Sequence, residues 1–294
     1  MALRGQSYVG DPGATGTSIS NTYAGAAAIQ ANDAIAVVTI VSNGNSSIGA
    51  FSITGGSGTF THGAALSPAL ADINIASNDA FMRCDVKLAG ASDVGFPTYT
   101  TSIVAAYYTQ AIFVFSGRVS SSIAALFNNQ VATTSSAETA VSFGYNLTGL
   151  TALSADDILV AIGIGMPFGR GSLTFSAAIA GYTNGLNGIG GHNYSPAICG
   201  LTNLNVSAGA TGTLASTISA SGGDTVAVGG YVFSLPAGSS GSSISPASGA
   251  AALTGNAPSM DLGIRPLTAR KAWDYTKGLL VPSRKIFLPA LTHG

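Results

Sequence analysis

ANDAIAVVTI (residues 31–40) and ADDILVAIGI (residues 155–164) are the two segments from which the fold class of this chain is predicted. Each opens with Asn or Asp turn chemistry and continues as a run of small and β-branched apolar residues. Runs of this kind, bounded by turn residues, are typical of β-strands. Because the same pattern occurs once in each half, we infer an internal repeat.

The remaining segments of the two halves follow the same order. The predicted strands are 33–41, 81–88, 99–106 and 111–117 in the first half, and 157–164, 198–206, 214–220 and 228–234 in the second. Four strands alone leave an apolar face and their edges uncovered, whereas two such sets packed face to face bury both apolar faces. The sequence therefore predicts an all-β fold, a single antiparallel β-sandwich of about eight strands, most simply a jelly roll.

Composition favours a protein that packs against its neighbours. Charged residues are 8% of the 294, and the mean hydropathy is +0.41. Low charge leaves little colloidal repulsion, so copies can approach closely, as in an assembly. The apolar runs fall short of the ~20 residues of a membrane-spanning helix, and MALRGQSYVGDPG (1–13) lacks the apolar segment of a secretory signal. We expect neither membrane insertion nor export by the general route.

Composition also divides the chain. Residues 1–236 make up the predicted sandwich, 237–260 a Gly/Ser-rich linker, and 261–294 a basic C-terminal arm. The arm has a net charge of +4, against −5 for residues 1–260. We expect its contacts to be made by Trp273, Leu279, Leu280, Arg284, Ile286, Phe287 and Leu288.

The arm is too short to form a core of its own, and its prolines prevent a long helix. It can fold back on its own sandwich or lie on another subunit, and the sequence leaves both open. Its basic residues lack the dense cluster or the series of stacking side chains typical of nucleic-acid arms, so we expect no nucleic-acid partner.

Catalytic patterns are missing from the sequence. The three histidines, His62, His192 and His293, stand outside any HExxH or ligand spacing, and no GxSxG, Walker or GxGxxG motif occurs. Asp156 and Asp157 are adjacent, so on a strand they point to opposite faces. We expect no enzyme activity, no cofactor and no metal.

Two further features concern the core and the loops. Cys84 and Cys199 lie at similar places in the two halves, with no CxxC pattern, so we expect both to be free and buried. The loops 65–78 and 185–197 should gather at the sandwich ends, where binding surfaces usually lie. Tyr182, His192 and Tyr194, in and beside the Gly/Asn-rich loop, are the candidate glycan contacts.

The segment order resembles a module encoded among the structural genes of tailed bacteriophages. In that module an "iqaGDllvv" strand opens each half, an "aGas" turn lies midway, and an "a.il.fsG" strand closes the first half. The counterparts here are 29–38 and 155–162, 89–92, and 111–117 with 231–234. The resemblance covers about residues 5–236. Asn32 stands where the module usually has Gly, and the loop around Phe60 lacks its usual Trp.

The resemblance implies a β-sandwich virion protein without recognised catalytic residues. We therefore expect a structural protein on the particle exterior, of the capsid decoration type, located in the virion and assembled in the host cytoplasm. A tail fibre or baseplate component and a glycan-binding adhesin module are the alternatives. The expected partners are other copies of the chain and other virion proteins, with a host glycan as a further possibility.

Overall fold

The computed structural model describes the residues 2–42, 51–66, 69, 71–74, 80–116, 128–138, 142–147, 151–152, 156–165, 175–191, 195–207, 209–220 and 226–235. The chain divides into two compact units, 1–241 and 242–294. The predicted arm and nearly all of the predicted linker belong to the second unit and lie outside the described residues. The described strands and cores all belong to the first unit.

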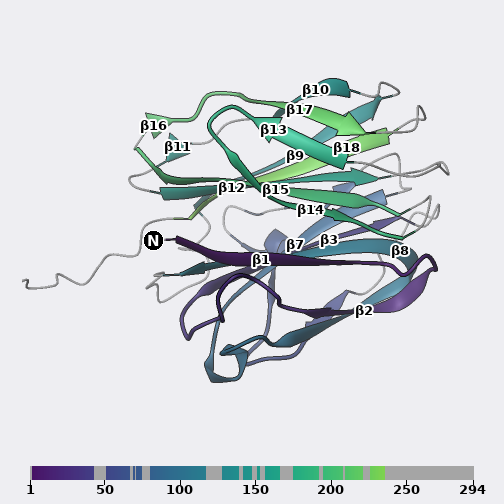
Figure 1. Cartoon of the computed structure of the whole chain (residues 1–294), viewed down its shortest axis with the longest axis vertical. Helices are drawn as coiled ribbons and strands as arrows, with labels where there is room; N and C mark the ends of the chain where they lie inside the picture. Colours follow the sequence, from purple (N-terminus) through teal and green to yellow (C-terminus); the bar gives the residue numbers. More distant parts are fainter. Residues whose placement is uncertain are drawn as a thin grey trace, which may run out of the picture. The chain divides into compact units, whose positions relative to one another are not determined.

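The first half of this unit builds a large antiparallel sheet (Figure 1). Its strands, in spatial order, are β1 (Ala2–Gly10), β8 (Thr98–Ser116), β3 (Ala34–Ser42), β7 (Ala80–Leu88) and β5 (Thr61–His62), with β6 (Ile73–Asn74) also paired to β7. β3 lies in the centre because its apolar run can be buried on both faces. All nine of its residues are buried.

The second half builds a sheet of the same strand order. Its strands are β9 (Asn128–Glu138), β18 (Val226–Leu235), β12 (Asp156–Gly165), β15 (Ala197–Val206) and β14 (Thr183–Ile189). β12, which holds the second of the two repeated stretches, occupies the central place that β3 has in the first half. The predicted internal repeat is thus present in the sheet topology.

Each half also carries a small sheet on its outer side. In the first half β2 (Gly16–Thr22) and β4 (Ser52–Thr54) flank the N-terminal part of β8. In the second half β10 (Ser142–Leu147), β17 (Leu214–Ala220) and β13 (Phe175–Ile179) form the corresponding sheet. The short pair β11 (Thr151–Ala152) and β16 (Gly209–Ala210) lies apart from it, and two 3-10 turns, η1 (Gly63–Ala65) and η2 (Ala91–Asp93), complete the described elements.

The apolar residues form cores between these sheets. The core between the two large sheets contains Ala36, Val38 and Phe113 from the first half with Tyr231 and Phe233 from the second. Separate cores lie between the large and small sheets of each half. The predicted shared interior is therefore present. The chain adds a second interior in each half, and the described strands number eighteen where about eight were expected.

The two large sheets meet as an internal pseudo-dimer. β3 contacts β12, while β1 contacts β14 at one side and β6 contacts β9 at the other. β14 occupies in the second sheet the edge that β5 occupies in the first, and β9 occupies the edge of β1. The edge of one sheet that carries β1 lies against the edge of the other that carries β14, and the edge that carries β6 lies against the edge that carries β9. Corresponding edges are therefore exchanged between the sheets, which is the pattern of an approximate twofold axis near β3 and β12.

Both cysteines are free and buried, as the sequence predicted. Their predicted equivalence is only partial, because they lie on corresponding strands but on opposite faces. Cys84 of β7 faces the core between the halves, whereas Cys199 of β15 faces the inner core of the second half. Burial raises the pKa of the Cys199 thiol to about 11.

Candidate functional site

The acidic turn before β3 has a structural role that links distant segments. The Arg4 guanidinium of β1 forms an ion pair with Asp33, with 2.5 Å between Nε and Oδ2, and the Gln30 N–H donates to the same carboxylate oxygen at 2.7 Å. Asp33 is 2% exposed. The turn thus holds the N-terminal strand to the start of the central strand.

A second buried ion pair joins β7 to η2, beside the loop around Gly56. Lys87 Nζ lies 2.6 Å from Asp93 Oδ1, with side-chain exposures of 2% and 0%. The ammonium also donates to the carbonyls of Gly55 and Ser57 and lies 4.5 Å and 4.6 Å from the ring centroids of Phe60 and Tyr99. Asp93, the residue that follows the "AGAS" turn, is therefore the anion of a buried ion pair.

The hydrogen bonds around Asp93 keep its carboxylate charged. Burial acts to raise its pKa, but donation from Lys87, the Gly90 N–H, the Tyr99 hydroxyl and the Ser57 N–H outweighs burial and lowers it. Burial lowers the pKa of Lys87, although Asp93 opposes that shift. Each polar atom has a partner, so this cluster stabilises the fold and leaves no group directed at a ligand.

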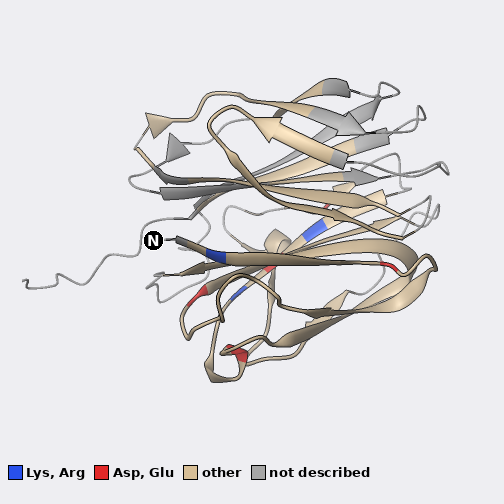
Figure 2. Cartoon of the chain, in the orientation of Figure 1, with Lys and Arg blue, Asp and Glu red and all other residues tan. Residues whose placement is uncertain are grey.

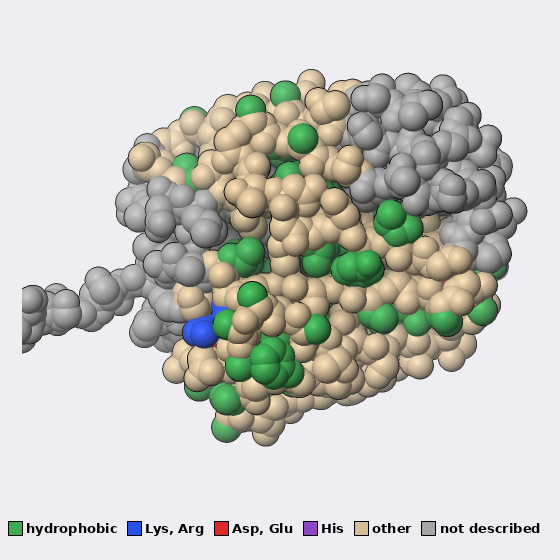
Figure 3. All heavy atoms as spheres, in the orientation of Figure 1, with side chains coloured by type: hydrophobic (Ala, Val, Ile, Leu, Met, Phe, Trp, Pro, Cys, Tyr) green, Lys and Arg blue, Asp and Glu red, His purple; other side chains and the backbone are tan. Residues whose placement is uncertain are grey.

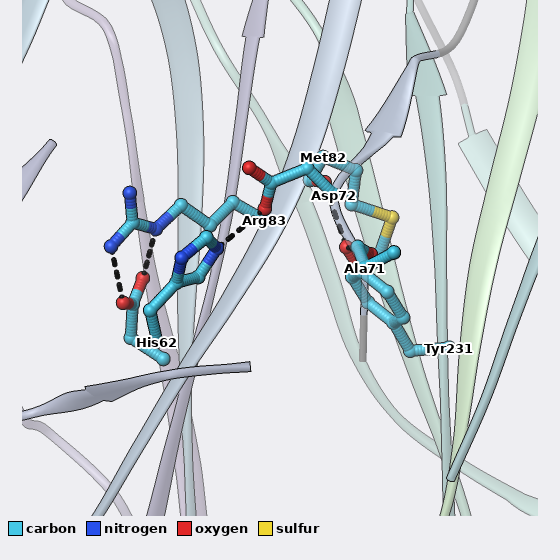
Figure 4. A network of polar contacts seen from close by, with 7 residues as sticks. His62, Ala71, Asp72, Met82, Arg83 and Tyr231 are labelled. Atoms are coloured by element: carbon cyan, nitrogen blue, oxygen red, sulfur yellow. Dashed lines mark hydrogen bonds and ion pairs between the residues drawn. The ribbon is translucent and has the colours of Figure 1, made fainter. Parts of the chain in front are cut away.

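A third group of polar residues lies where the two halves meet (Figure 4). His62 Nε2 and Asp72 Oδ1 are 2.8 Å apart, and both side chains are about one-third exposed. Arg83 forms two hydrogen bonds to Asp85, whose pKa burial raises against the influence of Arg83. The Tyr231 hydroxyl, from the second half, is shared between the carbonyls of Ala71 and Met82 at 2.9 Å and 2.8 Å.

This group resembles part of a catalytic site, because a His paired with an Asp can take up and release a proton. Hydrolytic chemistry would also need a nucleophile or a metal. Cys84, between Arg83 and Asp85 on β7, is fully buried in the core. Among the residues that the structure describes, no set of three or more His, Cys, Asp or Glu is placed to hold a metal ion. Of the printed contacts in this group, the two hydrogen bonds of the Tyr231 hydroxyl join the halves, and the two ion pairs lie within the first half.

The candidate binding site is an open pocket of about 360 Å³ in the second half. Tyr182, just before β14, lines it together with the apolar Ile179, Val206 and Leu214. Asn203, Thr211 and Thr213 add polar groups. Burial raises the pKa of Tyr182 to about 12, so its hydroxyl is neutral at physiological pH. The lining carries no formal charge, so the pocket suits an uncharged, partly apolar group.

Of the three predicted glycan contacts, the structure places Tyr182 in this pocket. His192 and Tyr194 lie outside the described residues, as do the predicted arm contacts Trp273, Leu279, Leu280, Arg284, Ile286, Phe287 and Leu288. Sequence reasoning missed the pocket's polar residues, because they come from β15 and from the connection before β17. No local motif marks residues that only the fold brings together.

Much of the described surface is uncharged, which follows from the composition (Figures 2 and 3). In the face seen in Figure 3, apolar side chains are scattered among uncharged atoms, and only a small area at one end is basic. No helix in the described part of the chain is long and apolar enough to cross a membrane. Comparison of the chain with protein-family models, curated proteins and solved structures gives no match.

Proposed function

We propose that this chain is a structural protein of the exterior of a tailed-bacteriophage particle, of the capsid decoration type. The observation that carries the proposal is the duplicated sandwich, in which two halves of one topology share an apolar core. Such a body offers a wide surface of uncharged residues. Its buried charges, among them Asp33, Lys87 and Asp93, form ion pairs between segments of the same chain.

The mechanism would be mechanical. The sandwich body would supply rigidity and surfaces for neighbouring subunits, and the basic arm, with a net charge of +4, would bind a neighbour or the acidic body of another copy. A low-charge surface supports this role, because it allows close packing of many copies. The resemblance of the segment order to phage structural modules is the second support.

The test is removal of the arm. A chain of residues 1–260 should keep the far-ultraviolet circular dichroism and the cooperative unfolding of the full chain, because strands between residues 2 and 235 pack against one another to form the described cores. It should lose attachment to particles, measured by co-sedimentation with capsids that lack the protein. A truncated chain that still sediments with particles like the full chain would contradict the role of the arm.

The position on the particle is a separate question with its own observation. A major capsid gene beside the gene for this chain supports decoration, whereas a tail tape-measure gene beside it supports a fibre or baseplate component. Immunogold labelling of intact particles would distinguish head from tail directly.

A further inference from the structure

An exposed apolar segment lies between η2 and β8 in the first half. Val94 and Phe96, on the connection between η2 and β8, are 49% and 55% exposed, the largest exposures among the large hydrophobic residues that the structure describes. Between them Gly95 has φ +104°, a conformation that favours glycine. We call the segment 94–96 the knuckle.

Backbone hydrogen bonds and ring stacking hold the knuckle against the first half. The N–H of Ile29 donates to the Gly95 carbonyl at 2.8 Å, and the Gly95 N–H donates back to the Ile29 carbonyl at 3.0 Å. The ring of Phe96 stacks on Tyr23, which is fully buried, at 6.1 Å between centroids. An exposed aromatic side chain held in one conformation loses little entropy on binding, which is typical of interface anchors.

The second half offers a receptor of matching chemistry. The pocket lined by Tyr182, Ile179, Val206 and Leu214 is uncharged and open, and its volume of about 360 Å³ is near the lower limit for ligand sites. That space suits one aromatic side chain with a small apolar neighbour better than an extended ligand. The pocket and the knuckle lie in different halves, so one copy can offer both to its neighbours.

We propose that the knuckle of one copy inserts into the Tyr182 pocket of a second copy of this chain. The inference deepens the proposed function, on which it rests, by naming the surface through which copies associate. Phe96 would stack against Tyr182 and contact Leu214, while Val94 covers the rim. Because the two surfaces differ, the contact is heterologous: it either closes a ring or extends, unless two copies exchange knuckles reciprocally.

The experiment uses the full chain and two variants with opposite defects. Phe96→Ser removes the knuckle's anchor, and Ala215→Trp fills the pocket from an exposed position on its rim. Analytical ultracentrifugation over a concentration series should show self-association of each variant weakened at least about tenfold. Val104→Ser, which removes an exposed apolar side chain of β8 outside the knuckle, is the matched control and should associate like the unaltered chain.

Mixing the two variants gives the sharper result. The Phe96→Ser copy keeps its pocket and the Ala215→Trp copy keeps its knuckle, so an equimolar mixture should form one-to-one complexes that neither variant forms alone. Circular dichroism of each variant verifies folding, and Val94→Ser, which should weaken association more mildly, replaces Phe96→Ser if that variant fails to fold.

Three outcomes would overturn the proposal: a full chain that stays monomeric at the highest concentration, variants that associate like the unaltered chain, or a mixture without complexes. If neutral monosaccharides shift the NMR signals of Tyr182 while Phe96→Ser leaves association unchanged, the pocket is a glycan site instead. None of these results bears on particle attachment by residues 261–294, so the proposed function and this contact can fail separately.

Discussion

Asn32, at the scale of one residue, sets the backbone shape of the turn before β3. Its φ is +67°. Among residues with a side chain, Asn is one of the few that adopt this left-handed conformation readily. The turn before β3 therefore keeps its backbone shape without glycine, and Asp33 remains placed to pair with Arg4.

Phe60 is a second single-residue example. The structure places its ring edge-on to Tyr99 and beside the Lys87 ammonium. An aromatic face is what a buried cation needs at this position, and Phe provides it.

The Asp93 carboxylate should make stability depend on pH in a defined direction. Because its pKa is lowered in the folded state, the carboxylate contributes stability above its unfolded pKa of about 3.9, and that contribution is lost as the pH falls through the folded value. Asp93→Asn should therefore lower the free energy of unfolding at pH 7, and its difference from the unaltered chain should shrink below about pH 4. Urea unfolding at both pH values measures it.

Asp85→Asn is the matched control, for which the change of stability with pH should have the opposite sign. Burial raises the folded pKa of Asp85, so the folded state takes up this proton first as the pH falls. Over the range where Asp85 protonates, the unaltered chain should gain stability relative to Asp85→Asn. Parallel pH profiles for the two variants would contradict the assigned electrostatics.

Among the elements, the central strands were predicted best. The strands expected at 33–41 and 157–164 correspond to Ala34–Ser42 and Asp156–Gly165, the central strands of the two large sheets. A run that is apolar on both faces has few alternatives to a strand between two cores. The strands expected at 99–106 and 111–117 are instead one strand of 19 residues, β8, which passes from the small sheet into the large one.

The prediction of a loop at 185–197 was partly wrong, because Thr183–Ile189 is an edge strand of the second large sheet. Its glycines suggested a turn, yet they serve the packing between the halves. A Cβ at Gly188 would overlap the Tyr8 ring, and one at Gly185 would overlap the Gln6 amide. Glycine within a strand can mark a close approach of another segment.

Gly163 of β12 should show the same effect in a measurable form. A Cβ there would overlap Ile40 Cδ1 and approach the sulfur of Met82, so Gly163→Val should cost about 1–3 kcal/mol of unfolding free energy through overpacking. Gly144→Val on β10 is the matched control, since nothing lies within 4 Å of its Cβ position. Urea midpoints compare the two, and equal midpoints would refute the close contact of the sheets.

For the whole molecule, the shared core between the large sheets implies that the halves depend on each other. Its members include Val38 and Phe113 from one half and Tyr231 and Phe233 from the other, and all four are fully buried. A separated half would expose that apolar face, which is much larger than a soluble protein usually tolerates.

Expression of the halves as separate chains should therefore fail, whereas their co-expression should succeed. With the chain divided between residues 120 and 121, each fragment alone should be insoluble or aggregated, and the two produced together should co-purify as a folded complex. Affinity purification through a tag on one fragment measures this outcome. Two soluble, cooperatively unfolding fragments would show that each half is an independent domain.

The strand class, the repeat and the burial of both cysteines could be predicted from the sequence. These follow from local chemistry: branched apolar runs favour strands, Gly and Asn clusters form turns, and a duplicated order of segments builds a duplicated topology. Three features depend on the three-dimensional fold: each half has its own inner core, the halves meet about an approximate twofold axis, and Lys87 pairs with Asp93 inside the first half.

The same division holds for the candidate site. Tyr182 could be selected from the sequence as an aromatic residue near a Gly-rich loop, but its partners Asn203, Thr211 and Leu214 could not. The knuckle and the pocket could not be predicted from the sequence either. The exposure of a side chain depends on which neighbouring segments cover it in the folded structure. Contacts between residues far apart in the chain depend on sheet register and layer order, which local preferences leave undetermined.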